Sequence, residues 1–258
     1  MNKIREAFSA GKTFIPFITG GDPDLDTTEK LLYALYEAGA DLIEIGVPFS
    51  DPIAEGPVIE AADQRALKAG CTIEKLLNTV SRVRPNIQAP LLFMTYFNPI
   101  YTYGVSKFTE HCAECGLDGL IIPDLPFEER GELLGPCTTQ RLELISLVAP
   151  TSNDRIAKIA KNSDGFLYCV SSLGVTGERC VLSHDANHIV EQVRLVTNIP
   201  CAVGFGISTP KQARDVASFA DGVIIGSSLV RIAAEHGRDC IDPVFNFAKE
   251  VKQAIGQF

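Results

Sequence analysis

Residues 41–60 read DLIEIGVPFSDPIAEGPVIE, a short apolar segment followed by a loop rich in prolines, glycines and acids. The segment 41–46 is apolar on both sides of Glu44, as expected for a parallel strand that is covered on both faces. The three prolines downstream fix their own backbone φ angles and favour a loop of defined shape. The sequence therefore predicts a buried strand that ends in an ordered acidic loop.

The same unit recurs along the chain, with a longer amphipathic segment after each apolar one. The eight apolar segments are 13–19, 41–46, 90–96, 118–123, 142–148, 164–170, 200–206 and 221–227. Eight strand–helix units in about 250 residues are typical of a (β/α)8 TIM barrel, whereas a doubly wound open sheet more often stops at five or six strands. We therefore expect an α/β fold of this class.

The ends of the chain add two helices to the predicted barrel. The stretch NKIREAFSA at residues 2–10 predicts an extra N-terminal helix that closes the bottom of the barrel, and residues 242–258 predict a final helix. No linker, low-complexity tract or block of charge interrupts residues 1–258. We therefore expect a single TIM-barrel domain.

Composition excludes several classes of function. The net charge of -9 argues against a nucleic-acid partner, although backbone amides can still hold a small anion locally. No segment reaches the roughly 18 apolar residues of a membrane span, and no signal peptide is evident at the N-terminus. The eight cysteines are scattered, as in a protein of a reducing compartment. We expect a cytoplasmic protein with no membrane contact and no disulfide framework.

Two short motifs resemble metal or redox sites. Cys112 and Cys115 form a CxxC next to His111, but they lie in a helical pattern without a second CxxC, which favours ordinary helix packing. His184 and His188 are spaced i, i+4, yet the glutamate of a zinc-protease motif is missing, which favours an exposed or capping pair. We therefore expect no metal site.

Carboxylates near the end of the second strand are the first candidates for chemistry, because TIM-barrel sites lie at the carboxyl ends of the strands. Glu44 must point either into the barrel or toward the helices, and its apolar neighbours would raise its pKa toward values useful for proton transfer. The alternative is a Glu44 that is paired with an Arg or Lys inside the barrel. Asp51 and Glu55 follow in the loop, and either acid could instead be solvated or cap the next helix.

Glycines cluster at the ends of the last three predicted strands, in SSLGVTGERC, VGFGIST and IIGSSLV. Barrels of this class commonly bind phosphate on backbone amides of the loops after strands seven and eight, and glycine lets the backbone approach an anion closely. The alternative is that these glycines serve tight turns alone. Their position on both late strands favours a phosphate site.

Several stretches carry a resemblance to a known family. They are FITGGDP (17–23), EIGVPFSDP (44–52), FNPIYTYG (97–104), IIPDLP (121–126), GVTG (174–177), GFGI (204–207) and IIGSS (224–228). Together these stretches resemble the tryptophan synthase alpha subunits nearly from end to end. The resemblance implies retro-aldol cleavage of indole-3-glycerol phosphate to indole and glyceraldehyde 3-phosphate.

The resemblance also implies partners and roles. The indole passes to a beta subunit in an alpha2beta2 complex, and the pyridoxal phosphate (PLP) belongs to that subunit, so no cofactor is expected in this chain. Glu44 matches the acid/base residue, and Glu55 matches the acid that holds the indole N–H and stabilises charge on the ring. The residues that match the substrate-binding positions are Tyr168, Thr176, Gly177, Gly204, Phe205, Gly206, Gly226 and Ser227.

Two departures from the family pattern leave a second hypothesis open. The family has Asp where this chain has Glu55, and a basic residue where this chain has Ser172. An extra methylene moves a carboxylate by roughly 1 Å, and a misplacement of that size can cost on the order of a hundredfold in rate. The chain is therefore either an active lyase or a catalytically impaired subunit that still activates its beta partner. A sugar-phosphate isomerase or epimerase is a third possibility, but it has no need for GVPFSDP.

Overall fold

The computed structural model describes residues 3–170, 183–204 and 206–256, and its strands form one closed parallel barrel in the order of the chain. Each strand pairs with the next, and β8 pairs with β1. The strands are β1 (Thr13–Thr19), β2 (Ile43–Gly46), β3 (Leu91–Met94), β4 (Gly119–Ile121), β5 (Glu143–Val148), β6 (Leu167–Val170), β7 (Cys201–Gly204) and β8 (Gly222–Ile225). All eight predicted segments contain a strand, so the prediction of a (β/α)8 barrel is confirmed.

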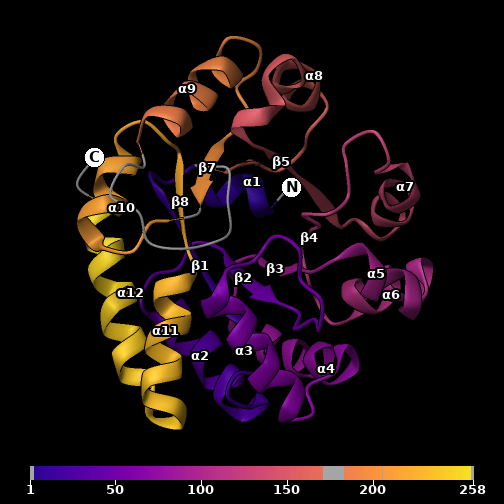
Figure 1. Ribbon diagram of the computed structural model, residues 1–258, viewed down its shortest axis with the longest axis vertical. Helices are drawn as coiled ribbons and strands as arrows, with labels where there is room; N and C mark the ends of the chain where they lie inside the picture. Colours follow the sequence, from indigo (N-terminus) through magenta and orange to yellow (C-terminus); the bar gives the residue numbers. More distant parts are fainter. Residues whose placement is uncertain (1–2, 171–182, 205, 257–258) are drawn as a thin grey trace.

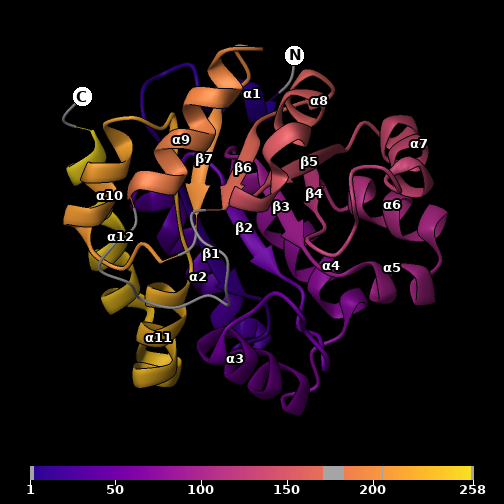
Figure 2. The ribbon, with the colours of Figure 1, turned by 45° about the horizontal axis from the view of Figure 1, so that its top comes forward.

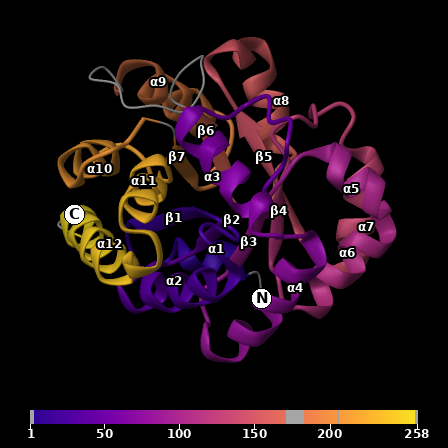
Figure 3. The same ribbon diagram turned by 60° about the horizontal axis from the view of Figure 1, so that its bottom comes forward.

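Helices ring the outside of the barrel (Figures 1 and 3). They are α1 (Lys3–Ala7), α2 (Leu25–Glu37), α3 (Pro57–Lys68), α4 (Ile73–Val83), α5 (Phe97–Tyr103), α6 (Val105–Glu114), α7 (Gly131–Gln140), α8 (Ile156–Lys161), α9 (Ser183–Arg194), α10 (Pro210–Ala217), α11 (Ser227–His236) and α12 (Ile241–Ile255). The last helix, α12, buries a stripe of apolar residues at helical spacing and packs against both α2 and α10. The prediction of a final helix is therefore confirmed, and α12 links the first and last parts of the helical layer.

The two faces of the strands belong to different cores. One core contains outward-facing strand residues such as Ile43 and Ile45 together with apolar residues of the surrounding helices. The other fills the barrel and consists of Ile4, Ile15, Leu42, Leu92, Ile121, Ile145, Phe166, Tyr168, Ala202 and Ile224. Ile4 is the only one of these ten residues that a helix supplies. The N-terminal helix α1 therefore closes the bottom of the barrel, which confirms the prediction for residues 2–10.

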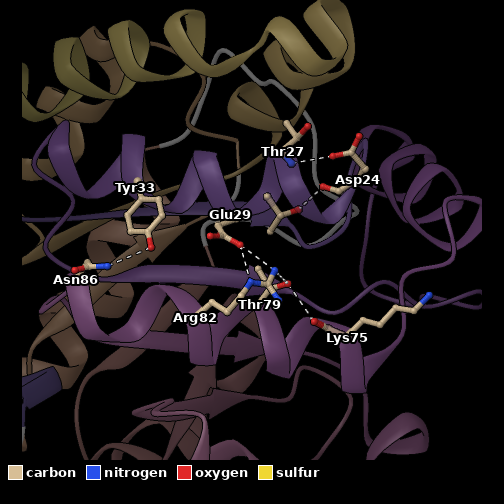
Figure 4. Close-up of polar contacts among 9 residues, drawn as sticks. Asp24, Thr27, Glu29, Tyr33, Lys75, Thr79, Arg82 and Asn86 are labelled. Atoms are coloured by element: carbon tan, nitrogen blue, oxygen red, sulfur yellow. Dashed lines mark hydrogen bonds and ion pairs between the residues drawn. The ribbon is translucent and has the colours of Figure 1, made fainter.

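Polar contacts fix the helices that flank the loop after β1 (Figure 4). The Asp24 side chain accepts a hydrogen bond of 2.8 Å from the Thr27 backbone N–H and so caps the start of α2. Farther along α2, Glu29 accepts a hydrogen bond of 2.9 Å from Arg82 Nε of α4. These contacts cap the start of α2 and hold this helix against α4.

The CxxC motif that resembles a metal or redox site is a packing feature. Cys112 and Cys115 are buried, Cys115 Sγ lies 3.2 Å from the Cys112 carbonyl oxygen, and His111 shares a hydrogen bond of 2.8 Å with Tyr103. His188 is exposed on α9, and the side chain of His184 lies outside the described part of the chain. All seven cysteines in the described part are buried and free.

The described residues hold no group of three or more His, Cys, Asp or Glu side chains that is placed to bind a metal ion. No helix among them is both long and apolar enough to cross a membrane.

Candidate active site

An apolar pocket opens at the carboxyl ends of the strands. Its empty volume is about 650 Å³, which includes the open solvent at its mouth. Ile59 of α3 and Ser227 of α11 belong to its lining. These two helices pack against each other (Figure 2). Its apolar wall consists of Phe17, Ile59, Met94, Tyr96, Tyr168, Ile207 and Ile224. A largely apolar pocket with a few polar groups on its wall is typical of a small-molecule site.

Glu44 points into the barrel. Successive side chains of a strand alternate between its two faces, and on β2 Ile43 and Ile45 belong to the outer core while Leu42 belongs to the interior one. Glu44 therefore shares the interior face with Leu42. On the neighbouring strands it is in register with Phe17, which lines the pocket, and with Leu92 of the interior core. This placement puts its carboxyl group at the floor of the pocket.

The Glu44 side chain is fully buried (0% exposed), and neither of its carboxyl oxygens has a hydrogen-bond partner among the described residues. Burial without a partner disfavours the charged form and raises the pKa of Glu44 well above its usual value. The alternative of a structural ion pair with an Arg or Lys is therefore wrong. At neutral pH the Glu44 side chain is set up to carry a proton.

The burial of Glu44 predicts an unusual pH dependence of stability. The folded-state pKa lies above the unfolded value of 4.5, so the two states hold the proton equally well only below that pH. As the pH rises through this window toward the folded pKa, the unfolded chain loses the proton first and unfolding becomes easier. We expect Glu44→Gln to gain stability over the wild type from about pH 5 to about pH 8, by at most about 1.4 kcal/mol per pH unit. Urea denaturation measures the free energy of unfolding of both proteins at each pH. A constant difference between them across that range would contradict this assignment.

Glu55 is half-buried in the loop before α3, and it lines the pocket. Its carboxyl group interacts with the Asp63 carboxyl group and with the Tyr96 hydroxyl. Burial raises its pKa, and the interactions with Asp63 and Tyr96 oppose that shift. Asp51, the other acid of the loop, is exposed. The structure thus separates the two loop acids, which the residue pattern without the family resemblance did not distinguish.

Asp63 and Tyr96 are parts of the site that sequence reasoning missed. Asp63 is 3% exposed and lies on the buried face of α3, which otherwise consists of Ile59, Ala62 and Ala66. An acid on the apolar face of an amphipathic helix is the signal that could have found it. Tyr96 follows β3, lines the pocket and accepts a hydrogen bond of 3.1 Å from the Ala54 N–H. Tyr96 therefore fixes the loop that carries Glu55.

Tyr168 of β6 lines the pocket. Burial raises the pKa of its hydroxyl well above the usual value, and the charge of the nearby Glu44 acts in the same direction. Its ring passes over Gly204 at the end of β7. A Cβ atom added at Gly204 would lie 2.6 Å from the Tyr168 hydroxyl oxygen. Gly204 therefore makes room for the tyrosine, whereas the sequence had placed it beside a phosphate.

Substitution of Gly204 tests this close approach. In Gly204→Ala the new methyl group must displace the buried Tyr168 ring, so we expect a loss of about 1–3 kcal/mol in the free energy of unfolding. The double variant with Tyr168→Phe lacks the hydroxyl nearest to that methyl group and should recover part of the loss. Urea denaturation of the single and double variants measures both effects. An equal loss in the two variants would show that the hydroxyl is not the obstacle.

Glycines and serines that follow β7 and β8 in the chain form one rim of the pocket. Gly206, Ser208, Gly226 and Ser227 line it. Gly206 has a φ of 80°, which favours glycine, and a Cβ atom at Gly226 would lie 3.0 Å from Phe17 Cδ1. Gly226 is the N-cap of α11 and makes no side-chain cap, so the first N–H groups of that helix are available to an anion.

The structure thus brings five predicted site residues to one pocket, and two more lie against it. Glu55, Tyr168, Gly206, Gly226 and Ser227 line the cavity, while Glu44 lies at its floor and Gly204 beneath Tyr168. Thr176, Gly177, Phe205 and Ser172 lie outside the described residues.

Known sequences resemble this chain over almost its whole length. The family described as "Tryptophan synthase alpha chain" matches residues 5–255. The tryptophan synthase alpha chain of Lacticaseibacillus casei is 43% identical over 255 residues, which cover 99% of this chain and 96% of that protein. The alpha chain of Citrifermentans bemidjiense is 45% identical over 262 residues, with coverage of 99% and 98%.

Solved structures agree with these sequence matches. Tryptophan synthase of Mycobacterium tuberculosis superposes with a TM-score of 0.91 at 35% identity, covering 98% of this chain and 97% of that one. The alpha subunit from Legionella pneumophila gives a TM-score of 0.89 at 34% identity, with full coverage of both chains. Identity above 30% over the full length indicates a shared fold and a shared family.

Proposed function

Because this chain belongs to the tryptophan synthase alpha chain family, we propose that it cleaves indole-3-glycerol phosphate to indole and glyceraldehyde 3-phosphate in tryptophan biosynthesis. One observation carries the assignment to this particular pocket. The fully buried Glu44 carboxyl group, which has no hydrogen-bond partner among the described residues, points into the barrel in register with Phe17, and Phe17 lines an apolar cavity whose wall holds a second acid. Acid and base groups with separately tuned pKa values are what such a cleavage needs.

Glu44 handles the protons of the reaction. Its proton goes to C3 of the indole ring, which turns the ring into a cation that can accept the electrons of the bond to the glycerol carbon. That bond then breaks, its electron pair restores the aromatic ring, and the glycerol hydroxyl loses a proton as it becomes the aldehyde. One proton enters at C3 and one leaves the hydroxyl, so the ionised Glu44 can recover its proton from the hydroxyl.

Glu55 stabilises the intermediate cation. Its carboxylate accepts the indole N–H and faces the positive charge that spreads over the ring after C3 is protonated. The Glu55 side chain is half-buried, so less water screens the interaction between its carboxylate and the charged ring. The aromatic and aliphatic wall around Tyr96 and Tyr168 suits the flat indole ring.

The phosphate of the substrate binds at the rim formed by Gly206, Ser208, Gly226 and Ser227. The N-terminus of α11 offers backbone N–H groups and the positive end of the helix dipole. Thr176, Gly177 and Phe205 complete the substrate site by family pattern.

We further propose that the chain works in an alpha2beta2 complex with a tryptophan synthase beta subunit in the cytoplasm. The beta subunit holds the PLP and joins the indole to serine, and this chain carries no cofactor of its own. The Mycobacterium tuberculosis relative supports the proposal, since its solved structure is described as tryptophan synthase.

The impaired-subunit alternative has less support than the active lyase. Its motivation was that Glu55 is too long for its role, yet Glu55 lines the pocket and has the neighbours Asp63 and Tyr96 that can hold it there. Nothing among the described residues favours loss of activity.

The experiment incubates the purified chain with indole-3-glycerol phosphate, with and without a beta subunit and serine, and follows indole and tryptophan separately. We expect indole from the chain alone and faster turnover with the beta subunit. If no cleavage occurs while beta activity on added indole still rises on mixing, the chain is only an activator. If mixing changes neither activity, the partner assignment is wrong.

A further inference from the structure

Glu55, which is half-buried, and Asp63, which is buried, form a pair of acids without an ion pair to any cation in the described part of the chain. Glu55 Oε2 and Asp63 Oδ2 are each buried and lack a hydrogen-bond donor among the described residues. The two carboxyl groups nevertheless interact with each other. Two carboxylates in contact repel, and two buried acceptors without a donor are costly. A single proton held between them would satisfy both oxygens and remove one charge.

The surroundings decide which acid keeps the proton. Burial and then the charge of Glu55 raise the pKa of Asp63 to about 9, and the further charge of Asp22 acts in the same direction. Asp22 is engaged by Arg65, whose Nε and second terminal nitrogen donate to it over 2.8 Å each. Burial also raises the pKa of Glu55, but its side chain is more exposed than that of Asp63, and its interactions with Asp63 and Tyr96 oppose the shift. At neutral pH Asp63 is therefore the protonated member and Glu55 the charged one.

We propose that Asp63 is a positioning residue, whose protonated carboxyl group donates a hydrogen bond to Glu55 and holds that acid in the pocket. This inference rests on the proposed function. Asp63 suits the task because α3 fixes its backbone between the buried residues Ile59, Ala62 and Ala66. It explains how a glutamate serves a position where the family pattern has the shorter aspartate, since the extra methylene brings the Glu55 carboxyl group to a donor.

We therefore expect the rate of cleavage to fall at alkaline pH. Above about pH 9 Asp63 loses its proton, the pair carries two charges, and Glu55 is pushed away from its place. The charged and titratable groups near the pair are Asp22, Glu60, Arg65, Cys71 and Tyr96. Of these, burial raises the pKa of Cys71 to about 11, so it stays neutral in this range, and burial raises the pKa of Tyr96 as well.

The test compares kcat and KM for cleavage from about pH 6 to about pH 10.5 in four proteins. In the wild type we expect kcat to fall about tenfold per pH unit above about pH 9. Asp63→Asn keeps an N–H donor but cannot ionise, so this limb should vanish. Asp63→Ala should lower kcat by about tenfold to a hundredfold at all pH values, with little change in KM. The matched control, Glu60→Gln, removes a neighbouring charge and should keep the wild-type limb.

An alkaline limb that is the same in Asp63→Asn and the wild type would overturn the inference, and so would full activity of Asp63→Ala. A second readout needs no turnover. The infrared difference spectrum between about pH 7 and about pH 10.5 should contain the band of a protonated carboxyl group that Asp63→Asn lacks. If the wild type forms no indole, the proposed function fails, while this band still decides whether the pair shares a proton.

Discussion

Glu44→Gln is expected to lower kcat for cleavage of indole-3-glycerol phosphate by on the order of 10²–10⁴-fold, the usual contribution of general acid–base catalysis. Glutamine fills the same volume at the floor of the pocket but has no acidic proton to give to C3 of the indole. The fully buried position leaves no room for solvent to replace it, because Glu44 is 0% exposed. KM should change little, since the substrate ring and phosphate contact other residues.

The chain offers a matched control for this substitution. Glu143 is another glutamate on a barrel strand, but it is only half-buried, and it begins β5 and so lies at the amino end, away from the pocket. Glu143→Gln makes the same chemical change and should retain wild-type kcat. Steady-state release of indole, measured for both variants, separates the loss of an acid in the site from a general effect of the change. Equal activity of Glu44→Gln and Glu143→Gln would contradict the assignment.

Glu55→Gln is expected to lower kcat by on the order of 10²–10³-fold, the cost of removing one preorganised group that stabilises developing charge. The variant still fills the loop position, but a neutral amide does not balance a cationic indole ring. The effect should fall on kcat more than on KM, because the charge develops only after C3 is protonated. Rapid-quench assays at saturating substrate measure this step.

Glu55→Asp serves as the internal comparison for that prediction. It keeps the charge but withdraws it by one methylene from Asp63, so its kcat should lie between those of the wild type and Glu55→Gln. A Glu55→Asp variant as slow as Glu55→Gln would mean that position alone matters. A Glu55→Gln variant as fast as the wild type would remove Glu55 from the mechanism.

The fold was predictable because its signal is repeated. Each strand segment, such as 13–19 or 221–227, is apolar throughout and is followed by a helical pattern, so a single misjudged unit would not have changed the fold class. The N-terminal helix was also predictable from its own pattern. The position of Ile4 inside the barrel was not predictable, because it depends on how the eight strands close, and no local sequence pattern shows this.

The orientation of Glu44 could not be predicted from its neighbours. Leu42, Ile43 and Ile45 are all apolar, because a barrel strand is buried on both faces, so the alternation that marks a half-exposed strand is missing. Only the cores to which these residues belong show which face points inward. That no described residue pairs with the Glu44 carboxyl group likewise depends on every strand of the closed barrel.

Asp63 was missed for a different reason. An acid in a helical segment is ordinarily solvated, and its burial becomes evident only when α3 packs against α11 and the barrel. Glu55 had the opposite problem: its family position drew attention, but its extra methylene looked like a defect. The proposed pair accounts for both residues, because Asp63 supplies a hydrogen-bond donor and the longer Glu55 side chain brings an acceptor to it.

The most direct test of the central claim isolates the proton transfer from the cleavage. Indole in D₂O exchanges its C3 hydrogen only if an acid adds a deuteron to C3 and a base removes the original proton, and proton NMR follows the loss of that resonance. We expect the wild type and Glu143→Gln to accelerate this exchange, and Glu44→Gln to leave it at the rate of indole alone. Exchange in Glu44→Gln as fast as in the wild type would show that another group delivers the proton.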